Sequence, residues 1–231
     1  MWIDVVDLRD FYAAPLGQAA RRMIRRKMRA MWPDMKGQRI LGIGYAAPYL
    51  EGFRDGQAAL VDELELPFPD LSMDRIVLVH ALECAEQVEP LMREIWRVLT
   101  DSGRLMVVVP NRSGLWARFE RTPFGHGRPF SPRQLSRLLR ESMFTPLTTD
   151  RALYMPPFRT ALLVRSAPAW ERAGAVLWGS FAGVVVMEAV KQIYAATPAH
   201  PARGRCAYLP MPERRGAAAG RVRLKPGPGA R

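Results

Sequence analysis

Apolar and polar positions follow two periods along this chain, and the periods predict an alternation of helices and strands. From Gly17 to Trp32 the apolar residues recur every three to four positions with arginines between them, which predicts an amphipathic helix. Residues 74–83 and 104–111 are instead nearly continuous apolar runs, typical of strands buried on both faces of a parallel sheet. A helix expected over 86–99 joins the two runs, so the order predicts a βαβ unit.

The same patterns extend on both sides of this unit. Ser131 and Pro132 supply an N-cap and a first-turn proline for a helix over 131–144, and the turn 100–103 should end the helix before it. The remaining expected elements are strands over 39–43, 58–63 and 145–155, a helix starting at 47, a helical stretch over 161–178, and a final strand over 181–194 with a helix-like end.

The most apolar stretch, 173–187, is about 15 residues long, short of the ~20 that a membrane-spanning helix needs. We interpret it as core, with a membrane-surface role as the lesser alternative. The acidic N-terminus lacks the apolar run of an export signal, and the two cysteines stand far apart in different contexts. A cytoplasmic protein without transmembrane segment, disulfide framework or metal site is therefore expected.

Positive charge is concentrated in two places. The chain has 34 Lys and Arg against 22 Asp and Glu, a net charge of +12. Residues 21–36 and the tail from 195 carry most of it, so the arginine face of the first helix is either a solvated face or a nucleic-acid contact. The tail, 195–231, is rich in Pro, Ala and Arg and is expected to be disordered.

Residues 65–111, with their "LPFPD" turn, "VLVHALE" strand end and "VVVPN" strand, resemble the second half of S-adenosylmethionine-dependent methyltransferases of the Rossmann-like class, the type 11 group. The resemblance covers roughly residues 36–192. It implies an α/β fold, a doubly wound and mostly parallel sheet with helices on both faces. It also divides the chain into an N-terminal basic helix region acting as a lid (1–36), a methyltransferase-like domain (37–194) and the tail (195–231).

Two departures from the family pattern concern the cofactor. In "RILGIGYAAPYL" Gly42 stands where the family has a carboxylate, Gly44 and Ala46 match two glycines, and Pro48 replaces the third. About ten residues separate Leu50 from the next expected strand, too few for a crossover, so one strand and one helix are expected to be missing. The family's ribose-binding acid then has no counterpart unless Glu51 or Asp55 fills in.

The resemblance gives other residues candidate roles, each beside a structural alternative. Asp62 and Glu63 would contact the adenine or are ordinary turn acids; His80 and Leu82 would line the pocket, or His80 is a satisfied core histidine. Tyr12 would fold over the cofactor or pack on the sheet. On the acceptor side the candidates, which lie in or beside a basic aromatic connection, are Asn111, Arg112 and His126.

Methyl transfer needs alignment more than side-chain chemistry, so the sequence identifies no catalytic residue. Two functions stay open. The first is a methyltransferase that uses S-adenosylmethionine on an unknown, small-molecule acceptor. The second is a methyltransferase-like basic module without catalysis, binding a partner such as RNA through the basic helix and tail. The sequence leaves the oligomeric state undetermined.

Overall fold

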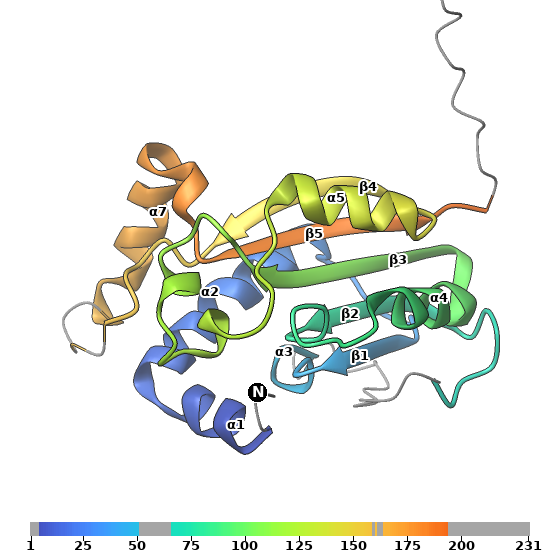
Figure 1. Ribbon diagram of the computed structural model, residues 1–231, viewed down its shortest axis with the longest axis horizontal. Coiled ribbons are helices and arrows are strands. Elements are labelled where there is room, and N and C mark those ends of the chain that lie inside the picture. The colour runs from blue at the N-terminus through green and yellow to red at the C-terminus, as the bar shows by residue number, and fades with distance from the viewer. Residues whose placement is uncertain (1–4, 51–65, 159, 161–163, 194–231) are drawn as a thin grey trace, which may run out of the picture. The chain divides into compact units, whose positions relative to one another are not determined.

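The computed structural model describes residues 5–50, 66–158, 160 and 164–193, and its sheet has five strands in the order β1-β2-β3-β5-β4 (Figure 1). The strands are β1 (Ile40–Gly44), β2 (Met73–Val79), β3 (Leu99–Pro110), β4 (Phe144–Ala152) and β5 (Val184–Lys191). β1, β2 and β3 pair in parallel, whereas β5 runs antiparallel to both β3 and β4. Four strands thus point one way, which confirms the α/β, mostly parallel sheet expected from the sequence.

The carboxyl ends of the three parallel strands lie side by side. Gly44 pairs with Val79, and Val79 pairs with Val108, so the last residues of β1 and β2 are in register with the end of β3. In sheets of this kind ligands bind outside the carboxyl ends of the strands, where loops converge. A ligand-binding site is therefore expected at this edge of the sheet.

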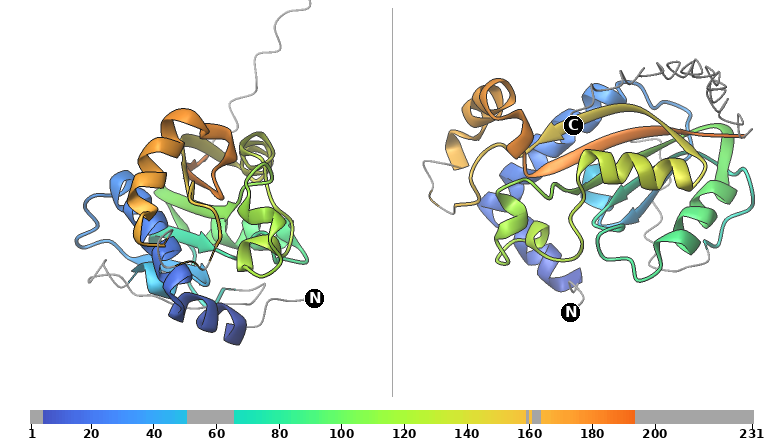
Figure 2. Two further views of the ribbon diagram at one scale, coloured as in Figure 1. Left: turned by 90° about the vertical axis from the view of Figure 1, so that its left-hand side faces the viewer. Right: turned by 45° about the horizontal axis from the view of Figure 1, so that its top comes forward.

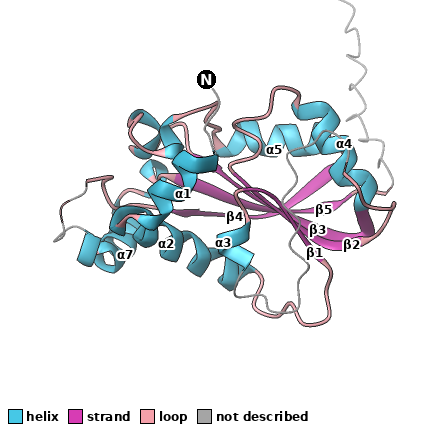
Figure 3. Ribbon diagram, turned by 90° about the horizontal axis from the view of Figure 1, so that it is seen from below, coloured by secondary structure: helices cyan, strands magenta, loops and turns pink. Residues whose placement is uncertain are grey.

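Helices cover both faces of the sheet, as expected (Figure 3). Against one face lie α1 (Val5–Ala13), α2 (Pro15–Met31), α3 (Ala47–Leu50) and α7 (Ala167–Leu177); against the other lie α4 (Val88–Val98) and α5 (Pro132–Glu141). Short 3₁₀ turns are η1 (Trp116–Arg118), η2 (Pro123–Gly125) and η3 (Gly179–Phe181). Each face of the sheet closes one apolar core, and α2 contributes Ile24 and Met28 to the first of them.

Local sequence explains where these helices begin. Ser131 accepts a hydrogen bond from the Gln134 backbone, and the Gln134 side chain accepts one from the Ser131 backbone, so α5 begins with a complete capping box. α2 has Pro15 at its first turn, where a missing N–H costs nothing. α1 and α2 belong to the same compact unit, Met1–Ala195, as the sheet.

Three expectations about the elements need correction. β5 ends at Lys191 as a strand without the helix-like end, because its residues pair with β3 and β4 along its length. The turn expected at 100–103 is instead part of β3, and the register of β3 against β2 shifts between Leu99 and Arg104. The stretch 173–187 is only partly core: Val176, Leu177, Trp178 and Phe181 are exposed, whereas β5 is buried. The strand expected over 58–63 falls on residues outside the described ranges. The expectation that one strand and one helix of the family pattern are missing concerns the same residues and stays a prediction.

Candidate functional site at the carboxyl edge of the sheet

The loop after β1 turns sharply at Gly44. Its φ of +71° is the left-handed region that favours glycine, and a Cβ built there would lie 2.4 Å from the carbonyl oxygen of Val79. The next residue, Tyr45, donates its backbone N–H to the same oxygen at 2.7 Å. Gly44 is thus required by the approach of β1 to β2 whether or not a ligand is bound.

Gly42, at the position where the family has a carboxylate, is enclosed by its own chain. A Cβ there would meet Leu50 Cδ1 at 2.6 Å and the Ala46 Cβ at 2.8 Å. Gly42 is therefore required by the packing of α3 on β1, and Ala46 is fully buried in the same contact.

The neighbouring strand, β2, is followed directly by a histidine with an unusual backbone. His80 has φ +56°, which non-glycine residues seldom adopt, although histidine is among those that tolerate it. Such outliers persist only where their surroundings hold them, and they cluster at functional sites. The His80 side chain is buried and bonded through both ring nitrogens.

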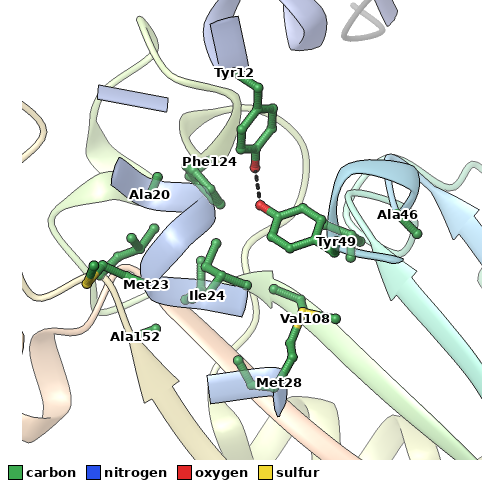
Figure 4. Close-up of a cluster of buried hydrophobic side chains, with 14 of the residues drawn as sticks. Tyr12, Ala20, Met23, Ile24, Met28, Ala46, Tyr49, Val108, Phe124 and Ala152 are labelled. Atoms are coloured by element: carbon green, nitrogen blue, oxygen red, sulfur yellow. Dashed lines mark hydrogen bonds between the residues drawn. The ribbon is translucent and has the colours of Figure 1, made fainter. Parts of the chain in front are cut away.

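Four buried side chains form one hydrogen-bonded chain at this edge. Tyr49 Oη donates to Tyr12 Oη at 2.8 Å, Tyr12 Oη lies 2.8 Å from His80 Nε2, and His80 Nδ1 lies 2.9 Å from Glu83 Oε1. Figure 4 shows Tyr12 from α1 and Tyr49 from α3 meeting through their hydroxyl groups. We call these four residues, Tyr49, Tyr12, His80 and Glu83, the buried relay.

Hydrogen-bond counting fixes the direction of the buried relay. Tyr12 Oη accepts the proton of Tyr49, so its own proton is free to be donated to His80 Nε2. Nε2 is then an acceptor, Nδ1 carries the ring proton, and Nδ1–H donates to Glu83 Oε1. A neutral imidazole satisfies every bond; a doubly protonated ring would leave the Tyr12 proton without this acceptor. Burial raises the pKa of Tyr12 well above its usual value, and burial likewise raises the pKa of Tyr49, so both stay protonated.

Aromatic rings enclose the buried relay. Tyr12 stacks on Tyr45 with ring centroids 5.1 Å apart and planes 14° from parallel. Phe124, from the connection 112–130, lies 4.9 Å from the His80 ring. The same connection reaches Glu83, because Arg128 N–H donates to the Glu83 carbonyl oxygen at 2.9 Å. Segments from α1, β1, β2 and the connection thus converge on one point.

One atom of the buried relay lacks a partner. Glu83 Oε2 is buried and accepts no hydrogen bond from the described part of the chain. A buried carboxylate oxygen without a donor is costly, and a cationic group placed against it would offset that cost. S-adenosylmethionine carries two positive groups, an α-ammonium and a sulfonium, so its charge fits this acceptor. Tyr12 is the side chain that lies over the same edge.

The structure brings some of the predicted site residues together. Gly44, Ala46, Tyr12 and His80 gather at the carboxyl edge, whereas Leu82 is buried in the core on the other side of the sheet. Asp62 and Glu63, like Glu51 and Asp55, lie outside the described residues. Tyr12 packs into the core, as its structural alternative expects, and its role over the cofactor stays a prediction.

The three acceptor-side candidates differ in their environments. Asn111 is buried, and its amide donates to the carbonyl oxygens of Ser180 and Ala182 at 3.0 and 2.7 Å, which holds the start of the connection against η3. Arg112 is exposed and His126 is half-buried. Arg112 and His126 are therefore the two side chains of this set that a ligand could reach from solvent.

Sequence reasoning missed Tyr49 and the unpartnered oxygen of Glu83. Glu83 stands three residues beyond His80 at the strand end, a spacing that could have suggested the pair. Tyr49 had no comparable signal, since its contact with Tyr12 spans 37 residues. Among the described residues no cluster of three or more His, Cys, Asp or Glu side chains could hold a metal ion. Nor is any helix in these ranges long and apolar enough to cross a bilayer.

The fold at this edge is that of a Rossmann-like methyltransferase. Residues 31–107 match the family described as "Methyltransferase domain", type 11. The fold is similar to that of a Thermotoga maritima protein described as an S-adenosylmethionine-dependent methyltransferase, possible histamine N-methyltransferase. The TM-score is 0.57 at 17% identity, covering 81% of this chain and 96% of that one. An Archaeoglobus fulgidus S-adenosylmethionine-dependent methyltransferase gives 0.52 at 18% identity, covering 74% and 94%.

One curated relative matches in sequence. It is the demethylmenaquinone methyltransferase of Deinococcus radiodurans, 29% identical over 120 residues, which are 51% of this chain and 49% of that protein. The chain thus spans about half the length of this curated relative. The fold is that of the Rossmann-like, S-adenosylmethionine-dependent methyltransferases, residues 31–107 are similar to their domain family, and these likenesses imply S-adenosylmethionine as the cofactor. A non-catalytic binding module gains no support from these matches.

Proposed function

We propose that the chain is an active S-adenosylmethionine-dependent methyltransferase with a small-molecule acceptor of the quinone type. The observation that carries the proposal is the convergence of the Gly44–Ala46 loop and the buried relay at the carboxyl edge of β1 and β2. The quinone class rests on the name of the Deinococcus relative alone. The scarcity of cysteines supports a reducing, cytoplasmic setting.

When bound, S-adenosylmethionine supplies a methyl group already activated by its sulfonium, so the protein has to bind, align and exclude water. The backbone of the Gly44–Ala46 loop and the carboxylate of Glu83 would hold it, with Glu83 Oε2 facing a positive group. Tyr12 would act as the lid that keeps water from the edge. Arg112 and His126, on the connection, would orient the acceptor.

Titration of the whole chain with S-adenosylmethionine, followed by calorimetry, tests the cofactor site. Glu83→Gln keeps an acceptor oxygen for His80 Nδ1–H and removes the negative charge. We expect its dissociation constant for S-adenosylmethionine to rise about 10- to 100-fold, since a hydrogen bond to a charged group is worth about 1.5–3 kcal/mol. Glu86→Gln, three residues away and exposed, is the matched control and should bind as the wild type does.

S-adenosylhomocysteine, which lacks the sulfonium charge, locates the contact. If Glu83 faces the sulfonium, Glu83→Gln weakens S-adenosylmethionine more than S-adenosylhomocysteine; if it faces the α-ammonium, both weaken equally. No binding of either compound to the wild type at millimolar concentration would refute the proposed function. Transfer of a labelled methyl group to reduced naphthoquinones, compared with polar amines of similar size, then tests the acceptor class.

A further inference from the structure

The carboxyl edge of the sheet also carries an exposed apolar surface that the proposed chemistry does not use. At the end of α7 and in η3, the side chains of Val176, Leu177, Trp178 and Phe181 are 83%, 66%, 46% and 58% exposed. Four large apolar side chains within six residues differ from the scattered exposed residues that every protein surface has. We call this group, residues 176–181, the apolar tip.

The apolar tip lies at the same end of the molecule as the candidate site. Figures 1 and 2 show α7 (orange) at the end of the sheet toward which β3 points, the same end as the connection 112–130 (yellow-green). Hydrogen bonds fix this neighbourhood, because the Asn111 amide donates to the carbonyl oxygens of Ser180 and Ala182. The apolar tip and the start of the connection 112–130 are therefore neighbours.

The connection that begins next to the apolar tip, at Asn111, is positively charged. The connection 112–130 has four arginines and one glutamate, a net +3, and all four arginines are at the surface. The stretch 173–187 itself contains no charged residue. Exposed Trp and Phe side chains on the same end of the molecule as these surface arginines suit an anionic bilayer, where aromatic rings lie at the headgroup level and basic groups pair with lipid phosphates.

We propose that the protein docks on anionic lipid bilayers through the apolar tip, with the arginines of the connection 112–130 against the headgroups. The occupant is a lipid surface, because exposed aromatic side chains together with surface arginines at one end of the molecule have the composition of an interfacial anchor. Four side chains and a few arginines suit reversible, peripheral binding. This inference is independent of methyl transfer, because it needs neither cofactor nor acceptor.

Vesicle flotation with the whole chain tests the proposal without any cofactor. We expect binding to vesicles of equal phosphatidylglycerol and phosphatidylcholine, and at least tenfold weaker binding to phosphatidylcholine alone. Leu177→Ser should weaken binding to the anionic vesicles about tenfold. Leu147→Ser is the matched control, since Leu147 is a comparably exposed leucine (49%) on β4, outside the apolar tip, and it should leave binding unchanged.

A depth measurement separates docking by the apolar tip from simple attraction of the basic tail to anionic lipid. Brominated acyl chains should quench part of the tryptophan fluorescence in the wild type, and Trp178→Phe should remove that part while keeping affinity within about threefold. Binding that Leu177→Ser leaves unchanged, or that shows no Trp178-dependent quenching, would overturn the proposal. So would a dimer that Leu177→Ser dissociates in sedimentation velocity, since a second copy would then be the occupant.

Discussion

Removing the hydroxyl of Tyr12 isolates the middle of the buried relay. In Tyr12→Phe the ring keeps its stacking on Tyr45, but Tyr49 Oη loses its acceptor and His80 Nε2 loses its donor. Each orphaned buried group costs about 1–3 kcal/mol, and partial relaxation of the two side chains recovers some of it. We therefore expect the free energy of unfolding to fall by about 2–4 kcal/mol.

Thermal and chemical unfolding measure this change. For a unit of this size, about 1 kcal/mol corresponds to about 2–4 °C, so the melting temperature should fall by about 5–15 °C. Tyr154→Phe is the matched control: the Tyr154 ring is half-buried, and its hydroxyl bonds to none of the described residues. It should change the melting temperature by no more than a degree or two.

The tautomer of His80 provides a second measurement. Nitrogen-15 NMR of the wild type should show a neutral ring with the proton on Nδ1, because Nε2 accepts from Tyr12. A proton on Nε2, or a Tyr12→Phe variant as stable as Tyr154→Phe, would refute the direction of the buried relay and the energy assigned to it.

Two further predictions concern residues at the two ends of β1. Gly44→Ala and Gly37→Ala both place a side chain at φ near +70°, but only at Gly44 does the Cβ meet a carbonyl oxygen, that of Val79. Urea unfolding should therefore show a loss of about 1 kcal/mol at Gly37 and at least about 2 kcal/mol more at Gly44, and equal losses would contradict the close approach. Arg39 donates to Asp74 and lowers the pKa of that carboxyl, so the pair's contribution is present above the ordinary pKa of Asp and lost as pH falls through the lowered value. Asp74→Asn should cost about 0.5–1 kcal/mol at pH 7 and less in acid, measured by unfolding across pH; a cost that grows as pH falls would contradict this sign.

The sequence predicted the elements whose pattern is local. Continuous apolar runs identified β2 and β3, the three-to-four spacing identified α2, and the Ser131 cap identified the start of α5. Apolar character alone did not distinguish buried from exposed residues in 173–187, because similar apolar side chains occur in the buried strand β5 and at the exposed end of α7.

The site was predictable residue by residue but not as an arrangement. Tyr12 and His80 were both candidates, yet they are 68 positions apart and no local pattern predicts that one donates to the other. Glu83 is a candidate because its second carboxylate oxygen is buried without a hydrogen-bond partner among the described residues, and no sequence pattern predicts this. Long-range packing decides such contacts, and a single sequence does not encode them in a readable period.

The position of β5 in the sheet has a consequence for how the chain folds. β5 is the last strand in the described part of the sequence, yet it lies between β3 and β4 and pairs with both. During synthesis, the edges of β3 and β4 that pair with β5 stay unpaired until residue 191 has been made. Pairings such as Val107 with Met187 close loops of about 80 residues, and contacts so distant in sequence form slowly. The newly made chain therefore depends on the insertion of β5 between β3 and β4, and its unpaired strands are most open to aggregation until β5 has been made.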